Sequence, residues 1–148
     1  MGKAQLKELE QTGKYFSVPR GISMWPMILN KQGVVEIHRL ESPARRYDVV
    51  LYVRGENDQG VIHRVLHVED TRYIIAGDNC WRKEYIPREK VVGIAVRFYR
   101  KGKWYEVTDW RYRIYVHLWT DLFFIRRPLF RLRDRLKAYR RKLKHAKE

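Results

Sequence analysis

Four side chains of this sequence, Ser23, His63, Asp78 and Glu84, are of types that together hydrolyse peptide bonds in many enzymes. Ser23 lies in the segment GISMWP, residues 21–26, between a glycine and a proline that both shape the backbone. That setting suits an exposed nucleophile. Because a serine hydroxyl is a poor nucleophile until a neighbouring base takes its proton, a partner base is required. An ordinary turn serine is the alternative interpretation.

The candidate base is His63, in the segment VIHRVLHV at residues 61–68. Strand alternation places His63 and His67 on one face, about 13 Å apart, which is too far for them to share a metal ion. A half-buried packing histidine is the alternative. We therefore expect neither a metal nor a cofactor.

The candidate acids follow a buried-looking strand. Asp78 lies in YIIAGDN, residues 73–79, and Glu84 comes six residues after it. A Gly-Asp pair is also a common turn, so this segment taken alone favours a structural role.

Short β-branched and aromatic runs separated by turn residues predict a mainly β domain over residues 16–108, with an antiparallel barrel or sheet as its core. Residues 1–15 are predicted to be a short N-terminal helix or arm. From residue 109 apolar side chains recur every three or four positions, which predicts a helical extension over residues 109–148, punctuated by Pro128. The expected strands are 16–18, 34–37, 48–53, 61–68, 72–76, 90–99 and 104–107.

Much of the positive charge lies in the last helix of this extension. The chain of 148 residues has a formal charge of +15, and residues 126–148 hold eleven Lys and Arg against Asp134 and Glu148, a net charge of +9. A basic amphipathic helix with nearby aromatic residues is typical of a segment at an anionic membrane surface, and we assign that role to residues 110–148. A solvated helix beyond a segment packed on the barrel is the second interpretation, and nucleic acid is a less favoured partner.

Composition restricts the class of protein to which this chain can belong. With 45% hydrophobic residues the chain has enough apolar surface for a core, so we expect a folded protein. The single cysteine, Cys80, excludes an intrachain disulfide and a thiolate metal site. Neither a secretory signal nor a membrane-spanning stretch is evident, so we expect a cytoplasmic protein, peripheral at the inner membrane face.

Four ordered segments resemble the signal peptidase I superfamily, which also includes the self-cleaving SOS and phage repressors. They are SMWP at 23–26, VIHRV at 61–65, AGDN at 76–79 and VVGIAV at 91–96. The resemblance covers about residues 16–99. It implies a signal-peptidase-like β core and a serine endopeptidase that cleaves a leader or signal-type peptide.

The resemblance also suggests roles. The His-Arg-Val at 63–65 is similar to the archaeal and endoplasmic-reticulum branch, whereas bacterial signal peptidases and repressors use lysine as the base. Ser23 then matches the nucleophile and His63 the general base. Asp78 matches the aspartate of the Gly-Asp-Asn segment, and Glu84 matches a further acid; we favour Asp78 as the acid that orients His63. The backbone N–H of Ser23 is the implied oxyanion donor.

The sequence departs from the family before the serine. About 20 polar or mixed residues precede Ser23, so we expect neither the family's membrane anchor nor a helix-turn-helix there. A catalytically inactive peptide-binding module is the competing hypothesis, and the presence of both Ser23 and His63 argues against it.

Overall fold

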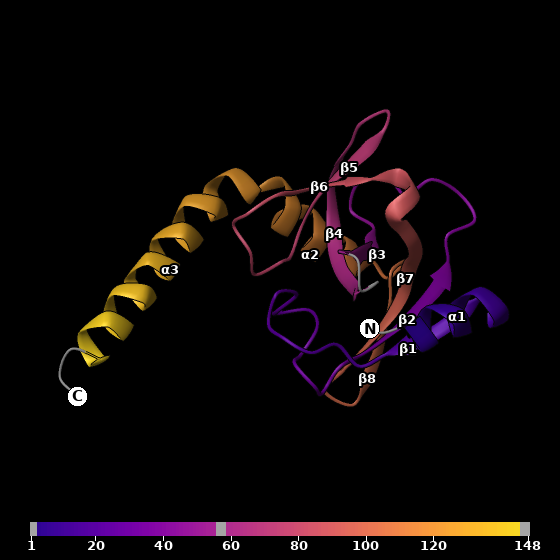
Figure 1. Ribbon diagram of the computed structural model, residues 1–148, viewed down its shortest axis with the longest axis horizontal. Coiled ribbons are helices and arrows are strands. Elements are labelled where there is room, and N and C mark those ends of the chain that lie inside the picture. Colours follow the sequence, from indigo (N-terminus) through magenta and orange to yellow (C-terminus); the bar gives the residue numbers. More distant parts are fainter. Residues whose placement is uncertain (1–2, 56–58, 146–148) are drawn as a thin grey trace.

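One antiparallel sheet dominates the computed structural model, which describes residues 3–55 and 59–145. The strands follow the order β1-β2-β7-β3-β4-β5-β6, and β8 pairs with β7. Of the two helices at the C-terminal end, the first lies beside the sheet and the second extends away from it (Figure 1). The strands are β1 (Lys14–Ser17), β2 (Val34–Arg39), β3 (Val49–Arg54), β4 (Gln59–Val68), β5 (Arg72–Ala76), β6 (Glu84–Pro87), β7 (Val91–Arg100) and β8 (Lys103–Glu106).

Both faces of the sheet carry buried side chains, as β3 illustrates. Val49 and Leu51 belong to one hydrophobic cluster, whereas Val50 and Tyr52 belong to another. Because neighbouring residues of a strand point to opposite faces, a run of buried residues such as VVLY is what a strand covered on both faces requires.

The mainly β, antiparallel prediction is confirmed, with one refinement. Among the described residues β1 and β6 end the sheet and do not pair with each other, so the barrel is not closed. All seven predicted strands are present within a few residues of their expected bounds. One further strand, β6, was not expected, and it carries Glu84.

Three α-helices accompany the sheet: α1 (Lys3–Thr12), α2 (Trp110–Asp121) and α3 (Phe123–His145), with a short 3-10 turn at Arg88–Lys90. The predicted helical extension is confirmed, but the break between its helices lies at Leu122 rather than at Pro128, which is inside α3. Phe123 is buried with Leu66 and Ala76, so packing against the sheet fixes the turn there.

Helix α3 runs away from the sheet for most of its length (Figure 1). In the described part of the chain, neither α3 nor a shorter helix combines the length and hydrophobicity needed to cross a bilayer.

Candidate functional site

His63 lies on β4 and its side chain is almost fully buried, 7% exposed. Its Nδ1 atom is 3.0 Å from Oε1 of Glu84 and 3.2 Å from the hydroxyl of Tyr52. Tyr52 in turn donates to Oε2 of Glu84 at 2.8 Å, and Arg54 also contacts that oxygen. Among the described residues, Nε2 of His63 has no hydrogen-bond partner. A histidine held at Nδ1 by a carboxylate presents its other nitrogen as the proton acceptor.

Strand register explains why Glu84 reaches His63. Val65 on β4 pairs with Ile75 on β5, and Ile75 pairs with Glu84 on β6. Directly paired residues share a face of the sheet, and so do residues two apart on one strand. Val65 and His63 therefore point to the same side as Glu84.

The same rule places Tyr52. Val50 on β3 pairs with His63, and Tyr52 follows two residues later on the same face. The Tyr52 hydroxyl is buried and finds its partners within this cluster, as a buried phenol requires. Its burial, together with the Glu84 carboxylate, raises its pKa above the ordinary value.

Glu84 is held as a carboxylate. Burial by itself would raise its pKa, but hydrogen bonds from His63, Arg54 and Tyr52 outweigh that effect and lower the pKa to about 2. A negative charge therefore stands beside the imidazole throughout the neutral range. Such a charge stabilises the imidazolium that forms when His63 takes a proton.

Ser23 lies in a loop that is fixed against the segment following β5. The Ser23 carbonyl accepts a 2.7 Å hydrogen bond from the backbone N–H of Asn79, and the Asn79 side chain donates to the Ile22 carbonyl at 3.1 Å. Met24, the next residue, is buried in the core. Ser23 itself is half-buried, and its neighbours in sequence are the buried Met24 and the exposed Ile22.

Gly77 is what permits this close approach. A Cβ atom at position 77 would lie 2.6 Å from the Ser23 carbonyl oxygen and 2.9 Å from Sγ of Cys80. The Ser23 carbonyl oxygen is a backbone atom, so it cannot move away by a change of rotamer. The AGDN segment therefore needs glycine at 77 for packing against the serine loop, whatever else it does.

Asp78 does not contact His63. Its carboxylate binds Arg64 through two hydrogen bonds, of 2.8 and 2.7 Å, and accepts a third from Tyr115 at 2.9 Å. The side chains of Arg64 and Asp78 are each 1% exposed. Arg64 is adjacent to His63 on β4, so its side chain lies on the opposite face of the sheet. Asp78, which is bound to Arg64, therefore lies on that opposite face as well. The preference for Asp78 as the acid on His63 is thus corrected: Glu84 makes that contact.

The Asp78 region also ties the C-terminal helices to the site. The Asp78 carbonyl accepts from the Trp119 indole at 2.7 Å and is contacted by Arg126, which is buried. Arg133 donates to the Asn79 side chain at 2.6 Å. Residues of α2 and α3 therefore hold the segment that abuts the serine loop.

A groove of about 1030 Å³ leads to Ser23. Its lining includes Phe16 and Ser17 of β1 and Val61 and Ile62 of β4. β5 pairs with β4 only from Arg64 onward, so β5 does not cover the edge of β4 at Val61 and Ile62. A strand edge of this kind can receive an extended peptide.

Backbone contacts link the segments that carry Ser23 and His63, but His63 does not line the groove that contains Ser23. The serine loop packs on Gly77, which directly follows Ala76, and Ala76 pairs with Arg64, the residue after His63. The two side chains are not hydrogen-bonded to each other in this structure. His67 is exposed.

Tyr52 and Arg54 are the site residues that sequence reasoning missed. One signal was available: Tyr52 is the single polar-tipped side chain in the apolar run VVLYV, so its hydroxyl needed a buried partner. Arg54 follows on the same face and carried no comparable signal.

No family model matches the chain, and neither do the curated proteins or the solved structures with which it was compared.

Proposed function

We propose that this protein is a serine endopeptidase of the signal peptidase superfamily that cleaves a leader or signal-type peptide by a Ser-His mechanism. The four motifs at residues 23–26, 61–65, 76–79 and 91–96 support the superfamily assignment. The observation that carries the proposal is the contact of Glu84 and Tyr52 with Nδ1 of His63, because a packing histidine on a strand needs no carboxylate.

The proposed reaction has two stages, acylation of Ser23 and hydrolysis of the acyl enzyme. His63 Nε2 takes the hydroxyl proton of Ser23 while Oγ attacks the carbonyl carbon of the scissile bond. The tetrahedral intermediate collapses, the C–N bond breaks, and His63 returns the proton to the leaving amine. Water then attacks the acyl ester of Ser23 while His63 accepts its proton; the ester C–O bond breaks, His63 returns the proton to Ser23 Oγ, and the acid product leaves.

Three other groups assist in this scheme. Glu84 orients His63 and stabilises its imidazolium, and Tyr52 fixes the Glu84 carboxylate. The backbone N–H of Ser23 donates to the oxyanion. Asp78 acts as a structural ion-pair partner of Arg64 rather than on the imidazole.

The groove supports a peptide substrate in extended form. Its volume, about 1030 Å³, is large enough for several residues, and its walls include the β4 edge at Val61 and Ile62. Backbone pairing along such an edge binds peptides without demanding one particular sequence, while side-chain pockets add specificity.

Cleavage of a peptide library tests this proposal. The full chain is incubated with peptides from a digested proteome, and new termini are identified by mass spectrometry. We expect cuts at recurrent sequences with wild type and none with Ser23→Ala. Equal cleavage by both proteins, or no cleavage by wild type, would contradict the assignment. Binding of the same peptides without cleavage would favour the inactive peptide-binding module instead.

We further infer that α3 holds the enzyme at an anionic membrane surface, on the cytoplasmic side. Six apolar side chains on α3 are spaced three or four residues apart and are between 46% and 61% exposed, although they are large: Ile125, Leu129, Leu132, Leu136, Tyr139 and Leu143. A solvated helix has no reason to expose such a stripe. The +9 charge of residues 126–148 opposes pairing of this stripe with a second copy and complements anionic lipid.

Vesicle cosedimentation checks the membrane inference. Wild type should bind phosphatidylglycerol vesicles, lose binding as salt rises, and ignore phosphatidylcholine vesicles. Leu136→Gln with Leu143→Gln should weaken binding severalfold, whereas Trp104→Gln, an exposed aromatic of β8, should not. Binding to nucleic acid at physiological salt, with no binding to anionic vesicles, would reassign the helix to nucleic acid.

A further inference from the structure

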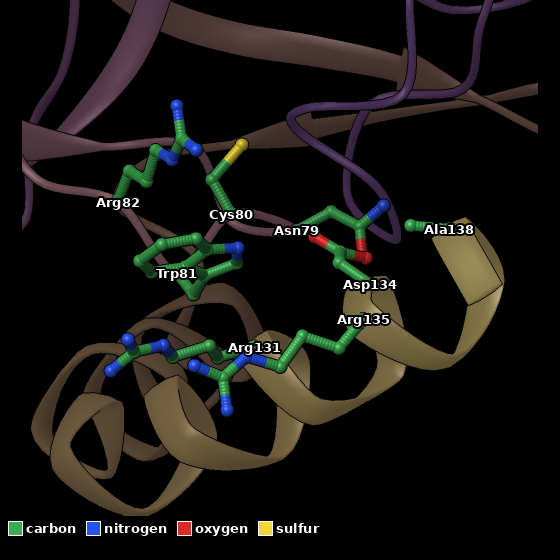
Figure 2. Close-up of a pocket in the computed structure, with 8 residues that line it drawn as sticks. All are labelled: Asn79, Cys80, Trp81, Arg82, Arg131, Asp134, Arg135 and Ala138. Atoms are coloured by element: carbon green, nitrogen blue, oxygen red, sulfur yellow. The ribbon is translucent and has the colours of Figure 1, made fainter.

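A second cavity, separate from the groove, lies between the loop after Asn79 and α3 (Figure 2). It has a volume of about 540 Å³ and shares no lining residue with the groove. Its walls contain Trp81 and three arginines, Arg82, Arg131 and Arg135.

The indole of Trp81 forms part of the wall of this cavity. The guanidinium carbon of Arg82 lies 4.9 Å from the ring centroid and that of Arg131 lies 5.5 Å from it. Figure 2 shows Arg131 and Arg135 rising from α3 toward Trp81, with Arg82 on the other side of the ring. Cation–π contacts orient guanidinium groups without neutralising their charge.

In the part of the chain that the structure describes, the three arginines of the cavity lack counter-charges. Among the described residues, none of Arg82, Arg131 and Arg135 lies within ion-pair distance of a carboxylate. Asp134 also lines the cavity, but its carboxylate accepts a 2.9 Å hydrogen bond from Arg133. Several guanidinium groups facing one cavity with no acid of their own are the arrangement that recognises a carboxylate.

The cavity borders the proposed catalytic site. Asn79 lines it, and the same residue donates its backbone N–H to Ser23 and its side chain to Ile22. The cavity and the loop that carries Ser23 are therefore joined through a single residue, Asn79.

We propose that this cavity, the Trp81 pocket, binds an acidic side chain of the substrate, so that the enzyme selects peptides with Asp or Glu at a fixed spacing from the cut. This inference rests on the proposed peptidase function for its biological meaning. The pocket's affinity for a carboxylate, however, can be measured without cleavage.

The binding experiment uses the full chain with Ser23→Ala, which cannot cleave. Fluorescence anisotropy compares a labelled peptide Ala-Ala-Glu-Glu-Ala-Ala with its Gln-Gln counterpart. We expect the Glu peptide to bind about tenfold more tightly, and less so at high salt. Arg82→Gln with Arg131→Gln should abolish the difference. Arg140→Gln with Arg141→Gln removes the same charge from an exposed part of α3 and should preserve it.

Three results would overturn the pocket assignment. One is equal affinity for the two peptides. Another is an equal loss in the Arg140/Arg141 control, because the effect would then reflect overall charge. The third is loss of phosphatidylglycerol vesicle binding by the Arg82/Arg131 variant with its peptide preference intact, which would make the pocket a lipid phosphate site.

The library cleavage profile separates this inference from the proposed function. If wild type cleaves, Asp or Glu should be enriched at one position relative to the cut, and the Arg82/Arg131 variant should lose this enrichment while still cleaving. Cleavage without enrichment contradicts the pocket and leaves the peptidase standing. If wild type cleaves nothing, the peptidase proposal fails and the anisotropy difference alone decides the pocket.

Discussion

Replacing Glu84 by glutamine tests the arrangement on which the proposed mechanism depends. Glutamine keeps the size and one hydrogen-bonding oxygen of Glu84 but removes its charge. We expect kcat to fall because the imidazolium of His63 loses its counter-ion, while KM changes little because Glu84 does not line the groove. The fold should survive, since the Glu84 side chain is one quarter exposed.

The magnitude can be worked from the geometry. His63 Nδ1 and Glu84 Oε1 are 3.0 Å apart. Two unit charges at that distance attract by about 5 kcal/mol at an effective dielectric constant of about 20. Solvent and the neighbouring Arg54 reduce this, so we take about half, about 3 kcal/mol. That corresponds to roughly a hundredfold fall in kcat.

The assay measures kcat and KM on the best-cleaved library peptide, together with thermal unfolding of each variant. Asp78→Asn is the matched control. It removes the carboxylate opposite a fully buried Arg64, so it should cost about 3–5 kcal/mol of stability. Molecules that remain folded should keep most of their kcat.

The opposite pattern would refute this reasoning. A Glu84→Gln enzyme with kcat within about threefold of wild type, beside a folded Asp78→Asn enzyme that has lost about a hundredfold, would return the orienting role to Asp78.

Three further outcomes are expected. His63→Ala should reduce kcat by several orders of magnitude, whereas His67→Ala should have little effect, since His67 is exposed; equal losses in the two variants would remove His63 as the base. Gly77→Ala should displace the Ser23 loop and lower both the melting temperature and kcat, because a Cβ atom there would lie 2.6 Å from the Ser23 carbonyl oxygen. Differential scanning fluorimetry and the peptide assay measure the two effects, and an unchanged melting temperature and kcat would contradict this prediction. The pKa of Glu84 is about 2 in the folded protein, against an ordinary 4.5. The Glu84 carboxylate therefore stabilises the folded state fully above about pH 4.5, and this contribution to the free energy of unfolding is lost as the pH falls toward 2. Urea unfolding should therefore show wild type losing up to about 3 kcal/mol relative to Glu84→Gln across that interval.

The strands of the core could be predicted because each is a short run of β-branched or aromatic residues between turn residues. The choice of Glu84 over Asp78 as the acid that contacts His63 could not. Glu84–Pro87 is a four-residue strand of mixed polarity, and only its pairing with β5 puts Glu84 on the face of His63. That pairing is a long-range event that local patterning does not encode.

The same limit applies to Asp78. Nothing in the AGDN segment indicated that Asp78 would bind Arg64, on the face of β4 opposite to His63. A buried arginine inside the VIHRV run was the available clue, since a fully buried guanidinium needs a carboxylate. The break at Leu122 was missed because Pro128 is the stronger local signal, whereas burial of Phe123 decides the turn.

The hydrogen bonds that surround Asp78 and Asn79 have a consequence for the order in which the protein can acquire activity during synthesis. The partners Trp119, Arg126 and Arg133 lie 41, 48 and 54 residues downstream of the groups they bind. Contacts so distant in sequence form late, after the ribosome has made both partners. The loop beside Ser23 is therefore completed only after the first turns of α3 have been synthesised, and a nascent chain that carries every proposed catalytic residue still lacks the support that holds its nucleophile in place.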